Sequence, residues 1–227
     1  MNPETQSPFN ALPPSVIALA VIIGGLEAMF QLADAGLLGG AGGVGWRIGA
    51  IQDFGLDPRL WDRMLDIGAV DWDVLRRFAT YPLLHGGAVE VLFAIVFVLA
   101  LGKLVAEQFS QAAFWAIFII STLAGGLGYV VLGGSERILI AAFPGAYGLI
   151  GAFTFILWMR LSNSDADATR AFTFIAILAG VQLLFSLFDL DFGRLVSDLS
   201  GFAAGFLLSF IVSPGGWARV LARLRQR

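Results

Sequence analysis

Six stretches of about twenty mostly apolar residues recur along the 227-residue chain. A helix of about 20 apolar residues is long enough to cross the hydrocarbon core of a bilayer. We therefore predict an all-α protein whose body is one bundle of six membrane-spanning helices. The predicted spans are Ser15 to Ala35, Leu84 to Ala106, Ala112 to Leu132, Ile138 to Met159, Ala171 to Phe188 and Leu195 to Val212.

The composition agrees with a polytopic membrane protein and excludes several other classes. Hydrophobic residues make up 58% of the chain and charged residues only 14%, which lies outside the range of soluble globular domains. The net charge of -3, without a long basic stripe outside the C-terminal tail, argues against a nucleic-acid partner. The absence of cysteine excludes disulfides, thiol catalysis and Cys-ligated metals. We expect no cofactor.

The chain divides into an N-terminal arm (1–14), a membrane domain (15–212) and a basic tail (213–227). The arm has no Lys or Arg before the first apolar run, unlike a secretory signal, so we expect a retained cytoplasmic arm. Basic residues near helix ends favour the cytoplasmic side, and the tail carries four arginines without an acid. With six spans, both termini are then cytoplasmic. Thirteen arginines against one lysine favour a bacterial inner membrane protein.

The one long connection, residues 36–83, is predicted to have structure of its own. After a glycine-rich start, it mixes apolar residues such as Trp61 and Trp72 with charges such as Arg63 and Asp66. This spacing indicates short amphipathic helices at the outer membrane surface. The alternative is a solvated, ion-paired surface helix without a further role.

Glycines in the later spans are spaced so that helices can approach closely. Gly148 and Gly151 lie in the fourth span, and Gly201 and Gly205 lie in the sixth. Small residues at such spacing let membrane helices pack backbone to backbone. We expect the third, fourth and sixth spans to pack tightly together.

Several motifs occur in an order that resembles the rhomboid intramembrane serine proteases over nearly the whole chain. Arg77 and the segment LLHGGAVEVLFA, which contains His85, resemble the rhomboid Arg-containing stretch and the Phe-Leu-His opening of the second span. AAFPGAYGLIGAF (141–153) aligns without a gap onto the motif that begins Gly-Ala-Ser-Gly. Asp198 and the following glycines align onto Ala-His-x-x-Gly-x-x-x-Gly. The resemblance implies a rhomboid-like six-helix bundle in which Arg77 anchors the outer loop.

The departures from the rhomboid pattern fall on the catalytic positions. The nucleophilic serine is replaced by Phe143, the base histidine by Asp198, the second-span histidine by Glu90 and the asparagine by Ala94. A serine hydrolase needs an activated hydroxyl and donors aimed at the oxyanion, and Glu90 would repel that charge. The resemblance thus implies a scaffold kept without its catalytic set, a pseudoprotease.

Three acids lie in apolar surroundings, where an ionisable residue is a functional candidate by default. Glu27 is interpreted as a protonated or partner-bonded acid facing the bundle. Glu90 and Asp198 are predicted to form a shared-proton or water-bridged pair that fixes the second span against the sixth. A metal site formed with His85 is a weaker alternative. His85 alone is interpreted as a hydrogen-bonded anchor for the outer loop.

The first functional hypothesis is a non-catalytic membrane protein that binds transmembrane clients in the bilayer and influences their assembly or turnover. An atypical rhomboid intramembrane serine endopeptidase is the enzyme alternative, and an accessory subunit of a larger membrane complex is the structural one. Phe143 either plugs the former active-site cavity or reflects neutral drift after catalysis was lost. A transporter is disfavoured, because no inverted repeat or interrupted helix pair is evident.

Overall fold

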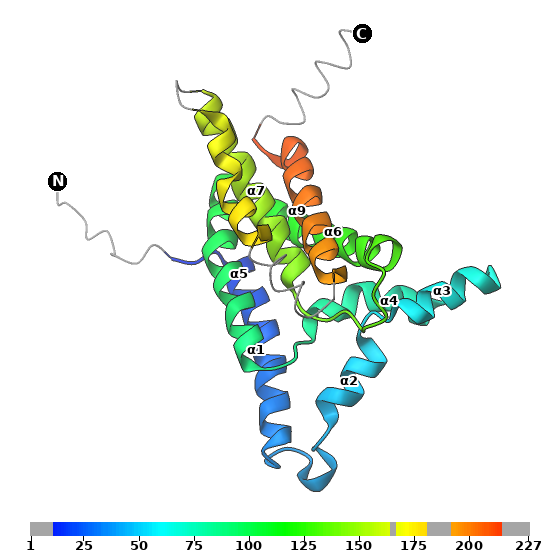
Figure 1. Ribbon diagram of the computed structural model, residues 1–227. Coiled ribbons are helices and arrows are strands. Elements are labelled where there is room, and N and C mark those ends of the chain that lie inside the picture. Colours follow the sequence, from blue (N-terminus) through cyan, green and yellow to red (C-terminus); the bar gives the residue numbers. More distant parts are fainter. Residues whose placement is uncertain (1–10, 164–166, 181–191, 215–227) are drawn as a thin grey trace, which may run out of the picture.

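The computed structural model describes residues 11–163, 167–180 and 192–214, and nearly all of its regular structure is helical (Figure 1). Five helices in this described part are long and apolar enough to cross a membrane. They are α1 (Pro14–Asp34), α5 (Ala88–Gln108), α6 (Gln111–Leu132), α7 (Phe143–Ser162) and α9 (Gly193–Val212). The prediction of an all-α, polytopic membrane bundle is confirmed.

The predicted fifth span falls partly outside the described residues. Its first part is the apolar helical segment Ala168–Gly180, which begins with the 3-10 helix η3 (Ala168–Phe172). The remainder, from residue 181, is not described. The same holds for most of the arm (1–14) and the tail (213–227), so those two divisions stay predictions.

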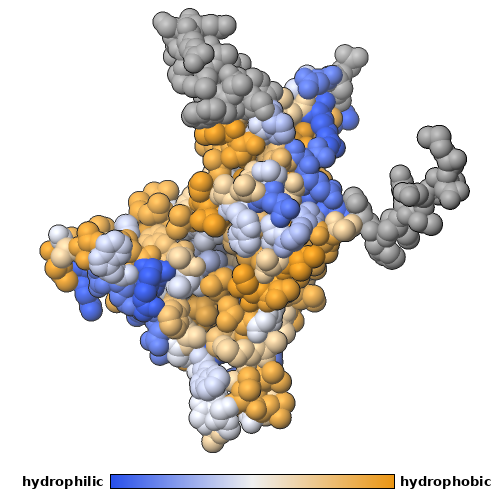
Figure 2. Space-filling model, turned by 180° about the vertical axis from the view of Figure 1, so that it is seen from behind, coloured by the Kyte–Doolittle hydropathy of each residue, from blue (hydrophilic) through white to orange (hydrophobic). Residues whose placement is uncertain are grey.

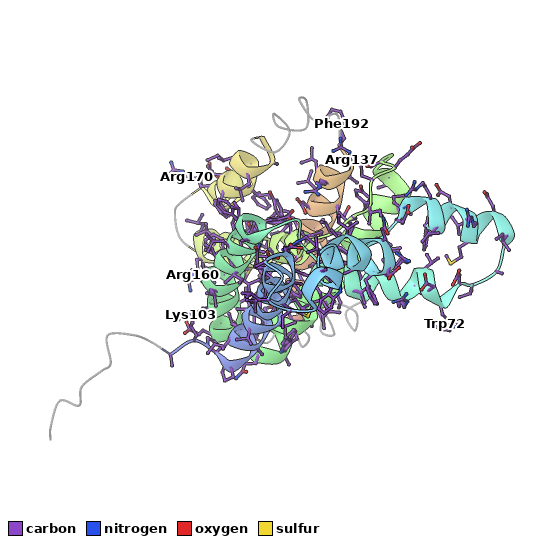
Figure 3. The ribbon with its side chains drawn as sticks, turned by 90° about the horizontal axis from the view of Figure 1, so that it is seen from below. Trp72, Lys103, Arg137, Arg160, Arg170 and Phe192 are labelled. Atoms are coloured by element: carbon purple, nitrogen blue, oxygen red, sulfur yellow. The ribbon has the colours of Figure 1, made fainter. Side chains whose placement is uncertain are left out.

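The connection between α1 and α5 contains the short helices that its sequence predicts. In chain order, they are η1 (Gly40–Gly42), α2 (Trp46–Phe54), α3 (Pro58–Ile67), α4 (Trp72–Thr80) and η2 (Tyr81–Leu83). Side chains of Asp57 and Asp71 cap α3 and α4 by accepting from backbone amides in the first turn. These two helices form an arm that projects sideways from the bundle (Figure 1), and Trp72 lies along its edge (Figure 3).

Helices α6, α7 and α9 form the most closely packed part of the bundle. A Cβ atom at Gly205 would overlap the backbone of Gly148, and one at Gly201 would overlap the backbone of Pro144. A Cβ at Gly151 would meet the backbone of Phe202. Only glycine permits such approach between membrane helices, so these positions set the α7 to α9 distance.

A second core joins α1, α5, α6 and α7 through fully buried aliphatic and aromatic side chains. Its members include Val16, Ile23, Val98, Phe114 and Leu149. Large apolar side chains also remain on the outside of these helices, as expected for a bundle in lipid, and they cover much of the face seen in Figure 2. Hydrophilic residues gather on the underside of the projecting arm and near the opposite end of the molecule.

Two spans begin later than their hydrophobicity predicts, because local backbone features delay the helices. α5 begins at Ala88, directly after Gly86 and Gly87. Before α7, Leu139 makes an antiparallel bridge with Leu56, and Ala141 has a positive φ of 82°. The apolar residues ahead of α7 therefore pack against the long loop and are not helical.

Candidate functional site

Phe143, which the sequence resemblance aligns with the rhomboid nucleophile, is the first residue of α7. Its partly buried ring packs against a cluster formed by Tyr147, Ile150 and Ile175. The ring thus fills space between α7 and the helical segment Ala168–Gly180. Pro144 follows at the start of the helix, and proline has no backbone N–H to offer an oxyanion.

Asp198 lies on α9 and is buried, with 6% of its surface exposed. The preceding Ser197 donates its hydroxyl to the backbone oxygen of Gly125 at 3.0 Å, which ties α9 to α6. The pKa of the Tyr81 phenol, in η2, is raised well above its usual range. Burial is the main cause, and the charge of Asp198 adds to it. The Tyr81 hydroxyl donates to the Thr122 carbonyl at 2.7 Å.

Ala94 and Glu90, which the sequence resemblance aligns with the rhomboid asparagine and second histidine, lie on α5. Ala94 is fully buried in the core. Glu90 accepts a hydrogen bond from the Gly86 amide at 2.6 Å and a longer one from Arg194 of α9 at 3.4 Å. Arg194 thus links the second span to the helix of Asp198. The shared-proton pair of Glu90 and Asp198 stays a prediction.

His85 lies just before α5, outside the five apolar helices, and only 2% of its surface is exposed. Its Nε2 accepts from the backbone amide of Ala142 at 3.4 Å, at the entry of α7. Burial lowers the pKa of the imidazole, which keeps the ring neutral and able to accept. Its carbonyl accepts from Arg47 at 3.0 Å. His85 therefore connects the long loop, α5 and α7.

Glu27 has a partner that our sequence analysis missed. Arg47 donates to both of its carboxylate oxygens, at 2.8 and 3.0 Å, and Gln31 donates to one at 2.7 Å. Arg47 also reaches Asp34. A buried acid requires a partner, and Arg47 is the first basic residue of the chain. That signal could have identified the pair.

Arg77 is buried and spans the base of the projecting arm. Its guanidinium donates to the carbonyl oxygens of Gln52 and Gly55, both at 2.8 Å, and pairs with Asp73 at 3.1 Å. These contacts join α4 to the end of α2. A role as loop anchor is compatible with this geometry and stays a prediction.

The hydroxyls nearest to Asp198 in sequence are occupied by the backbone. Ser197 donates to Gly125, as described, and Ser200 donates to Val196 at 2.7 Å. Within the described ranges, no three His, Asp or Glu side chains lie together as a group that could hold a metal ion, so His85, Glu90 and Asp198 are not brought into one metal site. What the arrangement offers is a buried carboxylate on α9 whose charge acts on the Tyr81 phenol.

Comparison with known proteins gives one family. The family model of the rhomboid domain matches residues 73–215, which is more than half of the chain. No curated protein matches. The matched region begins within α4 and includes α5, α6, α7 and α9, the helices that carry Glu90, Phe143 and Asp198. The chain therefore belongs to the rhomboid family.

Proposed function

We propose that this rhomboid-family protein is non-catalytic, binds transmembrane segments of client proteins within the bilayer, and influences their assembly or turnover. The observation that carries the proposal is Phe143, whose ring packs at the first position of α7, where the family pattern has a serine. Pro144 and the buried Asp198 complete a site that lacks both the nucleophile and the base of a serine hydrolase.

A client helix needs an apolar surface to pack on, and α5 offers one. Leu92, Phe93 and Val96 are between 52% and 61% exposed on this helix. Glu90 and Arg194 add a charged pair at one end of the same helix. Membrane helices associate through such packing together with interhelical polar contacts, so a client with a polar residue near one end of its span fits this surface.

Photo-crosslinking in native membranes tests client binding directly. A photoreactive amino acid at Phe93 is expected to trap membrane proteins, identified by mass spectrometry. The matched control is Val21, which is 65% exposed on a different helix, α1. Lipid adducts alone at Phe93, or the same proteins trapped from Val21, would contradict the proposal.

The enzyme alternative, an atypical rhomboid endopeptidase, is separated by incubating purified protein in liposomes with model transmembrane substrates. We expect intact substrate. Specific cleavage that disappears when Asp198 is changed to Ala would favour the enzyme instead. A fixed subunit of a larger complex would show one stoichiometric partner after native purification.

We also propose a bacterial inner membrane location, with the N-terminal arm and basic tail in the cytoplasm. Support comes from the four tail arginines and from Arg160 and Arg170 beside the loop after α7. Because the chain has no cysteine, single-cysteine variants give unambiguous labelling. A cysteine at Gln226 should be protected from membrane-impermeant reagents in intact cells, whereas one at Val70 should react.

A further inference from the structure

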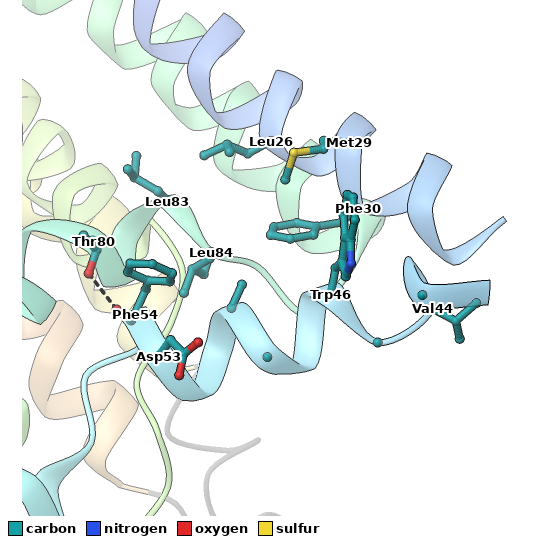
Figure 4. Close-up of a pocket in the computed structure, with 14 residues that line it drawn as sticks. Leu26, Met29, Phe30, Val44, Trp46, Asp53, Phe54, Thr80, Leu83 and Leu84 are labelled. Carbon is teal, nitrogen blue, oxygen red and sulfur yellow. Dashed lines mark hydrogen bonds between the residues drawn. The ribbon is translucent and has the colours of Figure 1, made fainter. Parts of the chain in front are cut away.

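An apolar cavity of about 650 Å³ lies between the second half of α1, helix α2 and η2, away from the Phe143 site (Figure 4). Phe30 of α1 and Trp46 of α2 stand against each other at one end of it, and Phe54 and Thr80 lie at the other. Most of the lining is aliphatic or aromatic. The remaining wall residues are Leu26, Met29, Gly42, Val44, Gly45, Gly49, Ala50, Asp53, Leu83 and Leu84.

The size of the cavity favours a single acyl chain as its occupant. Its volume falls within the range of small-molecule sites, about 300 to 1,000 Å³. Since an α-helix with its side chains is about 10–12 Å across, this volume holds less than about two turns of a helix. The cavity adjoins α1, whose Val21 and Ile22 are exposed on the outer surface of the bundle. An occupant drawn from the lipid is therefore within reach.

One end of the cavity carries charge. The carboxylate of Asp53 has no ion pair or hydrogen bond within the described part of the chain. Beside it, the guanidinium of Arg76 lies 4.8 Å from the centre of the Phe54 ring and donates to the Asp53 carbonyl at 3.3 Å. Arg76 also pairs with Asp73. Arg77 pairs with the same Asp73 carboxylate, so the charges of this cluster balance. The unpaired carboxylate of Asp53 is the group that can bind a cation.

We infer that this cavity binds one acyl chain of a phospholipid whose head group carries a primary amine, such as phosphatidylethanolamine. The chain lies among Leu26, Phe30 and Leu84. The ammonium group meets Asp53, which can accept its hydrogen bonds, and the phosphate lies toward Arg76. A quaternary amine has no N–H to donate, and an anionic glycerol head group carries no cation, so both are bound less well.

Native mass spectrometry of the full chain in detergent, with an equimolar mixture of phosphatidylethanolamine, phosphatidylcholine and phosphatidylglycerol of identical chains, tests the inference. We expect one phosphatidylethanolamine retained in preference to the other lipids by up to about fivefold, the most that an exposed ion pair usually contributes. Equal retention of all three lipids would overturn the head-group assignment.

Gly49→Leu tests the position of the chain. A Cβ atom at Gly49 meets nothing within 4 Å, and Gly49 lines the cavity, so we expect a leucine there to take up part of the cavity. Gly25→Leu on α1 is the matched control, because a side chain there also meets open space but outside the cavity. We expect Gly49→Leu to lose the retained lipid and Gly25→Leu to keep it. Equal lipid retention by the two variants would refute the site.

Asp53→Asn tests the ammonium contact without filling the cavity. We expect the preference for phosphatidylethanolamine over phosphatidylcholine to fall to about one, with total lipid retention unchanged. Asp66→Asn, an exposed acid on α3 outside the cavity, should leave the preference intact. A preference that survives Asp53→Asn would contradict the role of this carboxylate.

Discussion

At the scale of single residues, Ala141 has a backbone conformation that L-amino acids rarely adopt. Its φ is 82°, at the position where the rhomboid motif begins with glycine. Its amide donates to the Leu84 carbonyl at 2.7 Å, which holds the conformation in place. The left-handed conformation costs a non-glycine residue about 1–2 kcal/mol. Because Ala141 is buried, the substitution also loses a methyl group, worth about 0.8 kcal/mol. We expect Ala141→Gly to raise the melting temperature of the purified protein, by less than the full strain energy.

The adjacent Ala142 provides the control, since its φ of -79° suits any residue. Ala142→Gly removes a buried methyl group and gains no conformational relief, so it should lower the melting temperature. If both variants lower the melting temperature, or both raise it, the conformation of Ala141 is not what limits the stability of this turn.

His85 makes stability depend on pH. Burial lowers the pKa of the folded-state imidazole from 6.5, so the folded state binds its proton less readily than the unfolded chain does. The stability contributed by the neutral ring is complete above about pH 6.5 and is lost as the pH falls from there toward the folded-state pKa. The melting temperature of the wild type should therefore fall more between about pH 7 and pH 5 than that of His85→Gln.

The glutamine variant keeps a hydrogen-bond acceptor for Ala142 but cannot titrate. Comparing the two proteins cancels the carboxylates that both contain. Parallel pH profiles for wild type and variant would mean that His85 keeps the same pKa after unfolding.

Glu27 and Arg47 form a buried ion pair, with 7% and 11% of their side chains exposed. Removing one partner leaves an uncompensated buried charge, which costs about 3–5 kcal/mol. Arg47→Leu should thus destabilise strongly, while adding Glu27→Leu to that variant should recover a large part of the loss. Thermal unfolding of the two single variants and the double variant measures this coupling. Strictly additive effects would contradict the pairing.

The residue scale also shows what the sequence could not predict. Motif alignment assigned Phe143 to the nucleophile position, but the apolar run predicted a helix from Ile138, whereas α7 begins only at Phe143. Arg47 was not assigned to Glu27, because that contact depends on how a glycine-rich loop folds back over 20 residues. The proximity of Tyr81 to Asp198 likewise requires the path of the long loop, which local periodicity does not encode.

At the scale of elements, the α7 to α9 contact depends on glycines without space for a side chain. A Cβ at Gly205 would overlap the Gly148 backbone, whereas a Cβ at Gly25 of α1 meets nothing. Overpacking costs about 1–3 kcal/mol or more where the backbone must move. Gly205→Ala should lower the melting temperature clearly, and Gly25→Ala should leave it unchanged or raise it, since alanine favours helix. Equal tolerance of both would show that α9 can move away from α7 at little cost.

Helix existence was predictable at this scale, and helix starts were less so. Apolar runs identified α1, α6 and α9 to within about two residues, since hydrophobicity changes sharply at their ends. The run before α7 was equally apolar, but Leu139 pairs with Leu56 of the loop and not with its own helix. Hydrophobicity reports burial, and it does not distinguish a buried turn from the first turn of a span.

At the scale of the whole molecule, the family match coincides with the most closely packed part of the bundle. The rhomboid match extends from residue 73 to residue 215, and the closest packing joins α6, α7 and α9. These helices are held together by close backbone contacts at glycines, which do not involve side chains at the catalytic positions. We therefore expect that the catalytic side chains of the family could be replaced, as we propose for this chain, while the bundle stayed intact.

This independence leads to a prediction for the complete protein: restoring the serine alone, by Phe143→Ser, should not produce a protease. The chain has Asp198 where the rhomboid pattern has the histidine base, Ala94 donates no hydrogen bond, and Pro144 contributes no backbone N–H. Loss of one member of a catalytic triad alone lowers the rate by about a million-fold. Liposomes containing the variant and a model transmembrane substrate should show only intact substrate, whereas an active rhomboid protease cleaves it in parallel. Cleavage by Phe143→Ser that is absent from Phe143→Ala would mean that Asp198 can accept the proton of a serine, and that this bundle still positions a functional base.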